Sequence, residues 1–379
     1  MAGEVNMTEK KLNVAVIFGG RSGEHAVSLV SAKFVLSMLK PERYNVIHIG
    51  ISKQGAWWVG EGVLQALEAE QFGALRPATL LPDPTRPGLK QIEVKNGAEM
   101  LKTIANVDAV FPVLHGTYGE DGTLQGLLEM AGVAYVGAGV LGSSAGMDKA
   151  LFADVMRANQ IPVVDYVLIP RNLMETDMEA ALRIAESLGD YPLFVKPANL
   201  GSSVGVSKVQ NRADLLEGLM YAGQYDRRIL VQKGHNVREI EVSVLGNDDP
   251  QASVCGEISY AAEFYSYEAK YHDDASHATI PAEIPAETSD RIRELAIRAY
   301  KAVDISGMAR VDFFIDKDSD EVFLNELNTI PGFTQISMYP QLWKASGIPG
   351  EELVDRLIEL ALERRAQRDA TSHEYTRGG

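Results

Sequence analysis

The residues best suited to chemistry lie in the segment 309–334, ARVDFFIDKDSDEVFLNELNTIPGFT. Its two strand-like runs flank a turn-forming stretch, DKDSD, so the segment predicts a β-hairpin. Folding the hairpin about this turn places Asp312 opposite Glu326. Because side chains alternate between the two faces of a strand, Arg310 and Asn328 share that face. The sequence therefore predicts one sheet face that carries an arginine and three oxygen ligands.

Three oxygen ligands on neighbouring strands suit a hard divalent cation. We expect Mg²⁺ at Asp312, Glu326 and Asn328, with Mn²⁺ as the alternative ion. A solvated face with a cross-strand ion pair is the competing interpretation. The repulsion between an aspartate and a glutamate that face each other without a cation favours the metal site.

A second signal is the segment 194–208, FVKPANLGSSVGVSK. A strand ends at Lys196-Pro197, and the chain returns through a glycine- and serine-rich tip at 201–203. Backbone N–H groups of such a tip can lie over phosphate oxygens, and Lys196 can reach the same anion. The segment lacks the GK[ST] ending of a Walker A loop, and an ordinary flexible hairpin tip is the competing interpretation.

A third signal is the segment 260–281, which has no clean periodicity and contains five aromatic residues. Loops of this length in compact domains are usually functional or disordered, and the aromatic residues argue against disorder. We expect an active-site lid here. An ordered surface loop is the alternative.

Three other features are weak evidence for a function when they are taken alone. The sequence GSSAG at 142–146 fits the hydrolase elbow G-x-S-x-G but does not directly follow a strand. The sequence GGRSG at 19–23 lacks the dinucleotide spacing G-x-G-x-x-G. A serine hydrolase and a Rossmann dehydrogenase are therefore disfavoured. His115 ends a strand at the edge where open α/β sheets bind ligands, although a structural histidine is the alternative.

The hydrophobic pattern predicts the elements that must position these residues. An apolar run at 12–18, a glycine turn and a helical pattern are followed by strands at 46–51 and 107–114, which indicates an open parallel sheet. Residues 60–100 are weakly patterned and are expected to form loops and edge structure. A shift to glycine and serine near residue 137 marks the first boundary. We expect an N-terminal α/β substrate domain, a central domain and a C-terminal domain, at 1–137, 138–232 and 233–379.

Composition excludes several classes of protein. The chain has 379 residues, and its net charge of −16 argues against binding to nucleic acid or to an anionic membrane surface. A single cysteine, Cys255, cannot form an internal disulfide. No apolar run is long enough to span a bilayer, and no signal sequence is recognisable, so we expect a cytoplasmic protein.

Several motifs in a fixed order, taken together, are far more specific than any one of them. They are GGRSGEHAVSL, HGTYGEDGTLQGLLE, GMDKA, VKPANLGSSVGVSKV, REIEVSVLG, YEAKY, RVDFF and LNELNTIPGFT. From about residue 14 to about residue 363, the chain resembles the D-alanine–D-alanine ligases of the ATP-grasp superfamily. The resemblance implies an α/β (α+β), three-domain ATP-grasp architecture that begins with an open parallel sheet. It places ATP between the central domain and the C-terminal domain, which carries the metal site and the lid.

The resemblance also implies a nucleotide site with two Mg²⁺ ions, held by Asp312, Glu326 and Asn328. Further residues would contact the nucleotide at its phosphates, its adenine, its ribose and its transferred phosphoryl group. They are Lys149, Lys196, Gly201, Ser202 and Ser203 at the phosphates, Gln232 and Lys233 at the adenine, Glu239 at the ribose and Lys270 at the phosphoryl group.

A further set of residues would serve the two D-alanines. Glu24 would receive the ammonium group of the first D-alanine. Arg310, Gly332 and Ser337 would bind the second D-alanine and the developing oxyanion. Tyr271 would hydrogen-bond with Ser202 and Glu24 and lock the lid, and His115 completes the predicted catalytic set.

The implied reaction is the ATP-dependent ligation of two D-alanines to D-alanyl-D-alanine for peptidoglycan precursors. A carboxylate is a poor electrophile, and its phosphorylation gives an acyl phosphate that an amine can attack. This intermediate hydrolyses in water, so a lid must exclude solvent. The alternatives are a ligase with another acceptor, such as D-lactate, and a nucleotide-binding regulatory protein without catalysis. The resemblance also implies a homodimer.

Overall fold

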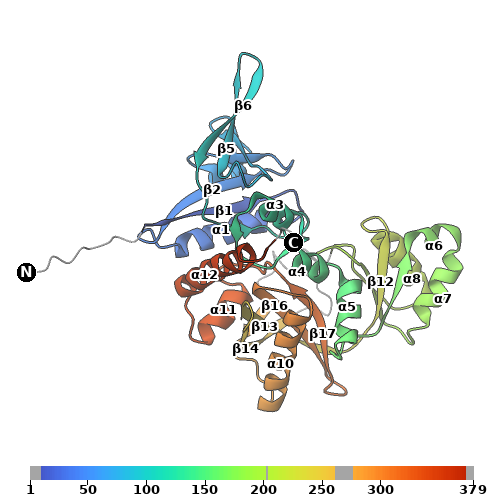
Figure 1. Ribbon diagram of the computed structural model, residues 1–379. Helices are drawn as coiled ribbons and strands as arrows, with labels where there is room; N and C mark the ends of the chain where they lie inside the picture. Colours follow the sequence, from blue (N-terminus) through green and yellow to red (C-terminus); the bar gives the residue numbers. More distant parts are fainter. Residues whose placement is uncertain (1–9, 202–203, 261–275, 373–379) are drawn as a thin grey trace, which may run out of the picture.

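The computed structural model describes residues 10–201, 204–260 and 276–372, which fold around three β-sheets (Figure 1). Within these residues, no helix is both long enough and apolar enough to cross a membrane. The α/β class expected from the sequence is confirmed. The three domain boundaries remain predictions.

The first sheet has eight strands in the order β6-β5-β4-β3-β2-β1-β7-β8. Its parallel half comprises β1 (Leu12–Gly19), β2 (Tyr44–Ile51), β7 (Ala109–Val113) and β8 (Ala134–Tyr135). Its antiparallel half comprises β3 (Trp57–Val59), β4 (Arg76–Leu80), β5 (Leu89–Lys95) and β6 (Ala98–Ala105). The helices of this region are α1 (His25–Met38), α2 (Val63–Ala69) and α3 (Thr123–Ala131). The parallel half was expected from the apolar runs.

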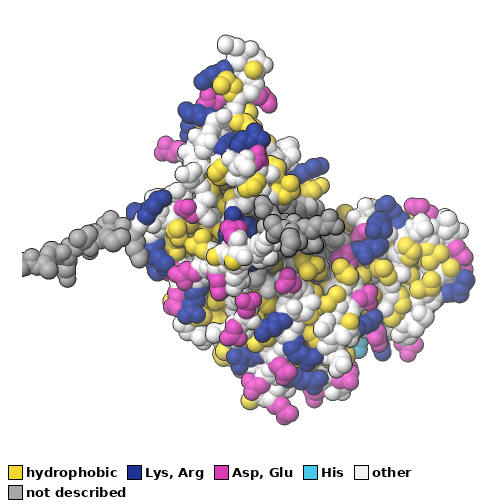
Figure 2. All heavy atoms as spheres, viewed as in Figure 1, with side chains coloured by type: hydrophobic (Ala, Val, Ile, Leu, Met, Phe, Trp, Pro, Cys, Tyr) yellow, Lys and Arg dark blue, Asp and Glu magenta, His cyan; other side chains and the backbone are white. Residues whose placement is uncertain are grey.

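Residues 60–100 form the edge structure expected there, since β4, β5 and the start of β6 lie at one edge of the first sheet, but α2 and the length of these strands were not expected. Strands β5 and β6 make a hairpin that projects from the body of the molecule (Figure 1). Hydrophobic side chains are visible on this hairpin (Figure 2), and Val94, Met100 and Leu101 are at least half exposed. A strand that buries neither face has no alternating pattern, which explains why the sequence did not indicate it.

The second sheet is antiparallel in the order β11-β10-β12-β9. Its strands are β9 (Tyr166–Pro170), β10 (Leu193–Pro197), β11 (Ser207–Val209) and β12 (Arg228–Lys233). Helices α6 (Arg171–Thr176), α7 (Met178–Glu186) and α8 (Arg212–Ala222) share one hydrophobic core with one face of this sheet. Lys196 and Gln232 lie on the other face by strand alternation.

The third sheet is antiparallel in the order β15-β14-β13-β16-β17. Its strands are β13 (Val237–Gly246), β14 (Gln251–Tyr260), β15 (Ser276–Thr279), β16 (Gly307–Asp316) and β17 (Val322–Asn328). Helices α10 (Ala286–Ala302), α4 (Val140–Met147) and α5 (Lys149–Ala158) pack into the core on one face of this sheet. The opposite face carries the polar residues predicted for the site.

The glycine- and serine-rich run at 142–146 lies inside α4. A Cβ atom at Gly142 would come within 3.0 Å of the Asp304 carbonyl oxygen, so the run permits close helix packing. The strand–turn–helix geometry of a hydrolase elbow is therefore not formed by this motif.

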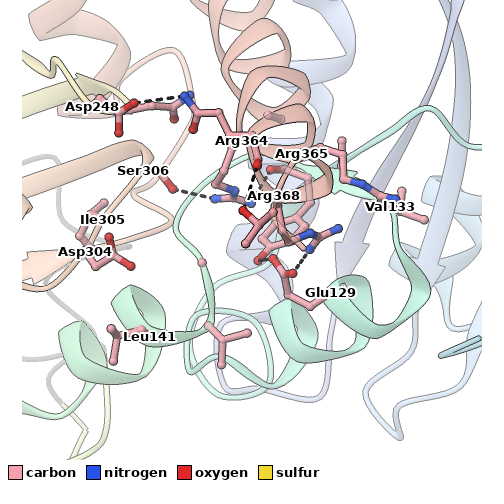
Figure 3. Close-up of a pocket in the computed structure, with 18 of the residues that line it drawn as sticks. Glu129, Val133, Leu141, Asp248, Asp304, Ile305, Ser306, Arg364, Arg365 and Arg368 are labelled. Atoms are coloured by element: carbon pink, nitrogen blue, oxygen red, sulfur yellow. Dashed lines mark hydrogen bonds and ion pairs between the residues drawn. The ribbon is translucent and has the colours of Figure 1, made fainter. Parts of the chain in front are cut away.

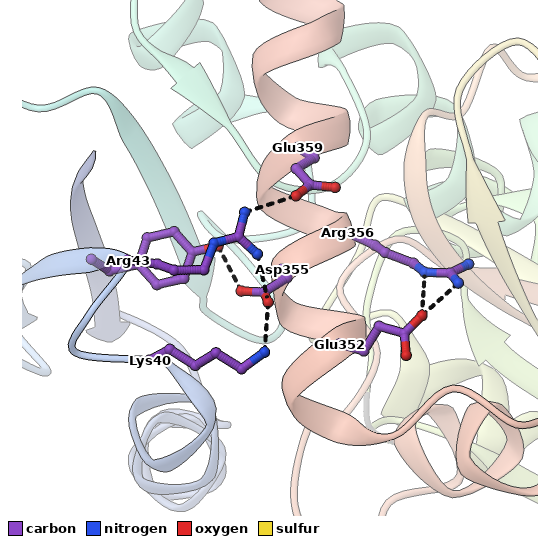
Figure 4. A network of polar contacts seen from close by, with 7 residues as sticks. Lys40, Arg43, Glu352, Asp355, Arg356 and Glu359 are labelled. Carbon is purple, nitrogen blue, oxygen red and sulfur yellow. Dashed lines mark hydrogen bonds and ion pairs between the residues drawn. The ribbon is translucent and has the colours of Figure 1, made fainter. Parts of the chain in front are cut away.

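The chain ends with α11 (Met338–Ala345) and α12 (Gly350–Asp369), and α12 packs against the first sheet and α1. Asp355 is buried in this contact and accepts hydrogen bonds from Tyr44 Oη at 2.6 Å and Lys40 Nζ at 2.9 Å (Figure 4). Arg43 Nη1 lies 2.7 Å from the same carboxylate. The pKa of Asp355 is lowered, because these partners outweigh the effect of burial.

The other end of α12 closes a cavity of about 690 Å³ between α3, α4 and the β13–β14 turn (Figure 3). Arg364 donates hydrogen bonds to the carbonyl oxygens of Tyr135, at 3.0 Å, and of Gly137. It also donates to Ser306 Oγ at 2.9 Å. Arg368 pairs with Glu129. These basic side chains are engaged in joining the first sheet to the third.

Asp355→Ala should lower the free energy of unfolding by ~1–3 kcal/mol, because three donors lose a shared buried acceptor. Glu352→Ala is the matched control on the same helix: its pair with Arg356 is 45% and 42% exposed and should contribute ~0.5 kcal/mol or less. Urea unfolding of both variants measures the difference. Equal, small losses would show that the Asp355 contact does not stabilise the docking of α12.

Candidate active site

The hairpin β16–β17 has the register that the sequence predicts. Asp312 lies opposite Glu326, and Arg310 lies opposite Asn328. The register shifts after Asp312, where β17 holds an extra residue. The arginine and the three oxygen-bearing side chains therefore share one face and are brought together.

Contacts within this group centre on Asp312. Arg310 donates from Nε to Asp312 Oδ1 at 2.8 Å and from Nη2 to Oδ2 at 2.7 Å. Asn328 Nδ2 donates to Asp312 Oδ2 at 3.0 Å, which leaves the Asn328 amide oxygen as an acceptor. Burial lowers the pKa of Arg310, but Asp312 and Glu241 outweigh it and hold the pKa well above its usual value.

Glu241 is a member of this face that the sequence analysis missed. It lies on β13 opposite Asp312, and its Oε2 atom is 3.0 Å from Arg310 Nε. The alternation in REIEVS places Glu239 and Glu241 on one face of a strand, so a period of two would have found it.

The donor set fits a hard divalent cation. Two carboxylates and an amide oxygen on adjacent strands, together with a third carboxylate one strand away, are oxygen ligands only. No group of three or more His, Cys, Asp or Glu arranged for a metal occurs among the described residues, so Asn328 is needed to complete the set. A soft or nitrogen-preferring metal has no suitable ligands on this face.

Lys196 on β10 faces these carboxylates from the second sheet. Burial and, to a smaller extent, Lys149 lower its pKa to about 8, although Glu326 and Glu239 partly oppose the shift. These four side chains therefore lie close enough to interact, although they come from four different elements. Two lysines opposite carboxylates suit a ligand that carries both phosphates and cations.

Lys149 also connects helix α5 to the tip after β10. Its backbone N–H donates to the Ala198 carbonyl oxygen at 2.8 Å, and its Nζ donates to the Leu200 carbonyl oxygen at 2.6 Å. Gly201 follows directly, while Ser202 and Ser203 lie outside the described residues. The predicted phosphate-binding segment is thus anchored beside Lys149.

Gln232 and Lys233 end β12, where the sequence predicts the adenine site. Gln232 is buried and lies opposite Phe194, on the same face as Lys196. Lys233 is exposed and lies on the other face, where its backbone N–H donates to the Asp165 carbonyl oxygen at 2.9 Å. Of these two residues, only Gln232 lies on the same face of the sheet as Lys196.

Glu24 lies at the start of α1, close to the tip that follows β10. Its N–H donates to Ser22 Oγ at 3.1 Å, and Ser22 Oγ donates to the His115 carbonyl oxygen at 2.8 Å. Gly116 has a φ of +74°, and a Cβ atom there would be 2.5 Å from Glu24 Oε2. A Cβ atom at Gly201 would be 3.4 Å from the same oxygen, so Glu24 lies between these two glycines.

His115 joins the first sheet to the loop after β17. Its Nδ1 lies 3.1 Å from the Ile330 carbonyl oxygen and 3.6 Å from Glu120 Oε1, and its Nε2 lies 3.0 Å from Ser31 Oγ. Burial lowers its pKa, but Glu120 outweighs burial and leaves the pKa raised. His115 therefore positions the loop after β17 beside Glu24.

Gly332 and Ser337 lie in that loop. Thr334 N–H donates to Ser337 Oγ at 2.9 Å, and a Cβ atom at Gly332 would be 3.1 Å from the same oxygen. Phe333 is buried against Phe34 and Phe111 of the first domain. The loop is therefore fixed between the first and third sheets. Lys270, Tyr271 and most of the segment 260–281 lie outside the described residues, and their roles remain predictions.

Comparison with known proteins agrees with this arrangement. The family model described as "D-ala D-ala ligase N-terminus" matches residues 13–138, and the model described as "D-ala D-ala ligase C-terminus" matches residues 155–359. The chain belongs to the D-alanine–D-alanine ligase family. The family and the fold expected from the sequence are thus confirmed.

Individual relatives cover nearly the whole chain. The D-alanine–D-alanine ligase of Heliobacterium modesticaldum is 51% identical over 95% of this chain and 98% of its own. The structure of the VanG D-Ala:D-Ser ligase from Enterococcus faecalis has a TM-score of 0.82 at 37% identity, over 93% of this chain and 100% of that one. The D-alanine–D-alanine ligase from Coxiella burnetii has a TM-score of 0.78 at 37% identity, over 95% and 96%. Structural neighbours within this family therefore include a protein named for a different acceptor.

The pKa of about 8 for Lys196 predicts a pH dependence for the binding of a nucleotide to this ligase. A lysine with a lowered pKa is charged below that pKa and neutral above it, so its attraction for phosphate is lost as the pH rises through about 8. We expect the dissociation constant for ADP, measured by calorimetry, to rise between pH ~7 and pH ~9.

Lys196→Arg keeps the positive charge over this range and should remove the pH dependence. Lys196→Met should bind ADP weakly at every pH. An affinity of the unmodified protein that stays constant over this range would contradict the role of Lys196 at the phosphates.

Proposed function

We propose that this chain ligates two D-alanines to D-alanyl-D-alanine, with ATP converted to ADP and phosphate, for peptidoglycan precursors. The observation that supports it most is the face of Arg310, Asp312, Glu326 and Asn328, which Lys196 approaches from the second sheet and Lys149 from the start of α5. Cations, oxygen ligands for a metal and a phosphate-binding tip are the groups that phosphoryl transfer requires.

In this proposal, ATP lies between the second and third sheets. Lys149, Lys196 and the backbone at Gly201 bind its phosphates, Gln232 binds its adenine with the backbone of Lys233 next to it at the end of β12, and Glu239 binds its ribose. Asp312, Glu326 and Asn328 hold two Mg²⁺ ions, or Mn²⁺ in their place. When bound, these ions would neutralise the negative charge of the phosphates during phosphoryl transfer.

The acyl group and the amine meet beside the first domain. Glu24 binds the ammonium group of the first D-alanine, and its position between Gly116 and Gly201 supports this role. The carboxylate of that D-alanine attacks the γ-phosphorus of ATP, an O–P bond forms, and ADP leaves with the electron pair. The amine of the second D-alanine then attacks the acyl carbon, loses a proton and expels phosphate.

Arg310, Gly332 and Ser337 serve this second step. Arg310 donates to the oxyanion that develops at the acyl carbon, and a planar guanidinium fits this task better than a point charge. The loop that carries Gly332 and Ser337 is fixed by His115 and Phe333, so it can hold the second D-alanine close to Arg310. Ser202, Lys270 and Tyr271 complete the proposed site from outside the described residues.

The test is a reaction with ATP, Mg²⁺ and D-alanine in which ADP, phosphate and dipeptide are measured. We expect ADP and dipeptide in equal amounts, and no ADP without D-alanine. Competition with D-lactate and D-serine decides the acceptor, and D-alanine should dominate. ADP formation that does not depend on D-alanine, or a main product with another acceptor, would contradict the proposal.

Glu326→Gln tests the metal site, because it keeps the shape of the side chain and removes the charge opposite Asp312. We expect dipeptide synthesis to fall ~100-fold or more, while the melting temperature changes little. If the two carboxylates merely repel each other, the variant should instead be more stable and equally active. A folded Glu326→Gln protein with normal turnover would exclude the metal assignment.

Two further proposals concern the whole protein. We propose a homodimer, and the exposed apolar side chains of β6 offer one surface that could take part. Multi-angle light scattering of the purified protein would decide between monomer and dimer. We also propose that the enzyme acts in the cytoplasm, where ATP is available; fractionation of cells that express it tests this.

A further inference from the structure

A row of three carboxylates crosses the third sheet. The backbone register places Glu241 on β13 opposite Asp312 on β16, and Asp312 opposite Glu326 on β17. Arg310 lies in the next row of the same face, opposite Ser243 on one side and Asn328 on the other. The arginine is thus bordered by acidic side chains on two neighbouring strands.

One edge of the Arg310 guanidinium is fully engaged by these acids. Nε is 2.8 Å from Asp312 Oδ1 and 3.0 Å from Glu241 Oε2, and Nη2 is 2.7 Å from Asp312 Oδ2. Among the described residues, Arg310 contacts these acids through its Nε–Nη2 edge, and Nη1 lies at the other end of the guanidinium. The side chains of Arg310, Asp312 and Glu241 are only 15%, 13% and 9% exposed, so water screens their charges weakly.

We propose that Glu241 is a positioning residue that anchors Arg310 while Asp312 serves as a metal ligand. This inference rests on the proposed function, because it assigns a task to Arg310 and Asp312 in that reaction. The carboxylate oxygens of Asp312 must both bind the cation and accept the hydrogen bonds of Arg310. Glu241 supplies a second carboxylate at Nε, so the guanidinium keeps its place and orientation when Asp312 turns its charge toward the cation.

Loss of the Glu241 charge should therefore have two linked effects. Arg310 would depend on Asp312 alone, so it would compete with the metal for that carboxylate. When the metal binds Asp312, the Arg310 guanidinium would lose its anchor and could turn away from the acyl carbon. The first effect weakens metal binding, and the second leaves the acyl phosphate to react with water instead of the amine.

The experiment compares Glu241→Gln with Glu257→Gln. Glu257 lies on β14 of the same sheet and pairs with Arg238 at 2.6 Å, but on the opposite face. It is therefore a matched glutamate–arginine pair with no proposed role in the reaction. For each variant we would measure the binding of Mn²⁺ to the ADP-loaded protein by electron paramagnetic resonance, and the ratio of phosphate released to dipeptide formed.

For Glu241→Gln we expect Mn²⁺ binding ~10–100-fold weaker than in the unmodified protein, as for other residues that support metal ligands. The phosphate-to-dipeptide ratio should rise above one. Glu257→Gln should match the unmodified protein in both measurements. A residue that only stabilised the sheet would change the melting temperature without changing the ratio or the affinity for Mn²⁺.

Unchanged Mn²⁺ binding and an unchanged ratio in folded Glu241→Gln would overturn the proposal. If Glu241→Gln does not fold, Glu241→Asp provides the test, because it keeps the charge but withdraws the carboxylate by one methylene group. The proposal then requires a raised ratio in Glu241→Asp, and an unchanged ratio overturns it. Failure of the proposed function is a separate result, since the unmodified protein would then make no dipeptide.

Discussion

The site depends on the concentration of like charges on one buried sheet face. Glu241, Asp312 and Glu326 lie side by side on three strands, and the protein holds them together with one guanidinium, one amide and the lysine that faces them. Carboxylates in such a row repel one another more strongly as they lose contact with water. The same repulsion that would destabilise the sheet makes it attract cations. The second sheet and helix α5 place two lysines, Lys196 and Lys149, next to this face.

The sequence predicted this face well because it depends on two local rules. The turn DKDSD set the hairpin, and the alternation of strand side chains set which residues share a face, so Arg310, Asp312, Glu326 and Asn328 were all found. The bulge after Asp312 did not disturb this prediction, because the paired rows before it were kept. Glu241 was missed since its relation to Asp312 depends on pairing between strands about 70 residues apart, which no local pattern sets.

The packing of helices from one part of the chain onto a sheet from another could not be predicted either, because no local pattern sets contacts between distant segments. Helices α4 and α5 follow the first domain in sequence, yet Ala145, Phe152 and Met156 pack into the core of the third sheet. The hairpin β5–β6 was missed because its side chains bury little on either face. Motif order identified the family and predicted a set of site residues, whereas the physical neighbours of those residues required the structure. Lys196 is an example: burial and Lys149 of α5 lower its pKa, Glu326 of β17 and Glu239 of β13 oppose this shift, and no local pattern sets these neighbours.

Helix α12 has a consequence for how the protein is made. Leu353, Val354, Leu357 and Ile358 complete the same hydrophobic core as Val14, Val16 and Phe18, although more than 300 residues separate them. The first domain leaves the ribosome long before the helix that covers it. During synthesis, the part of this core that α12 covers therefore stays exposed, although α1 and α2 already pack against the same strands, so the nascent chain carries an aggregation-prone surface until α12 is released. The core around β1 is thus complete only after α12 has been synthesised, so a segment more than 300 residues further along the chain is a structural part of the first domain.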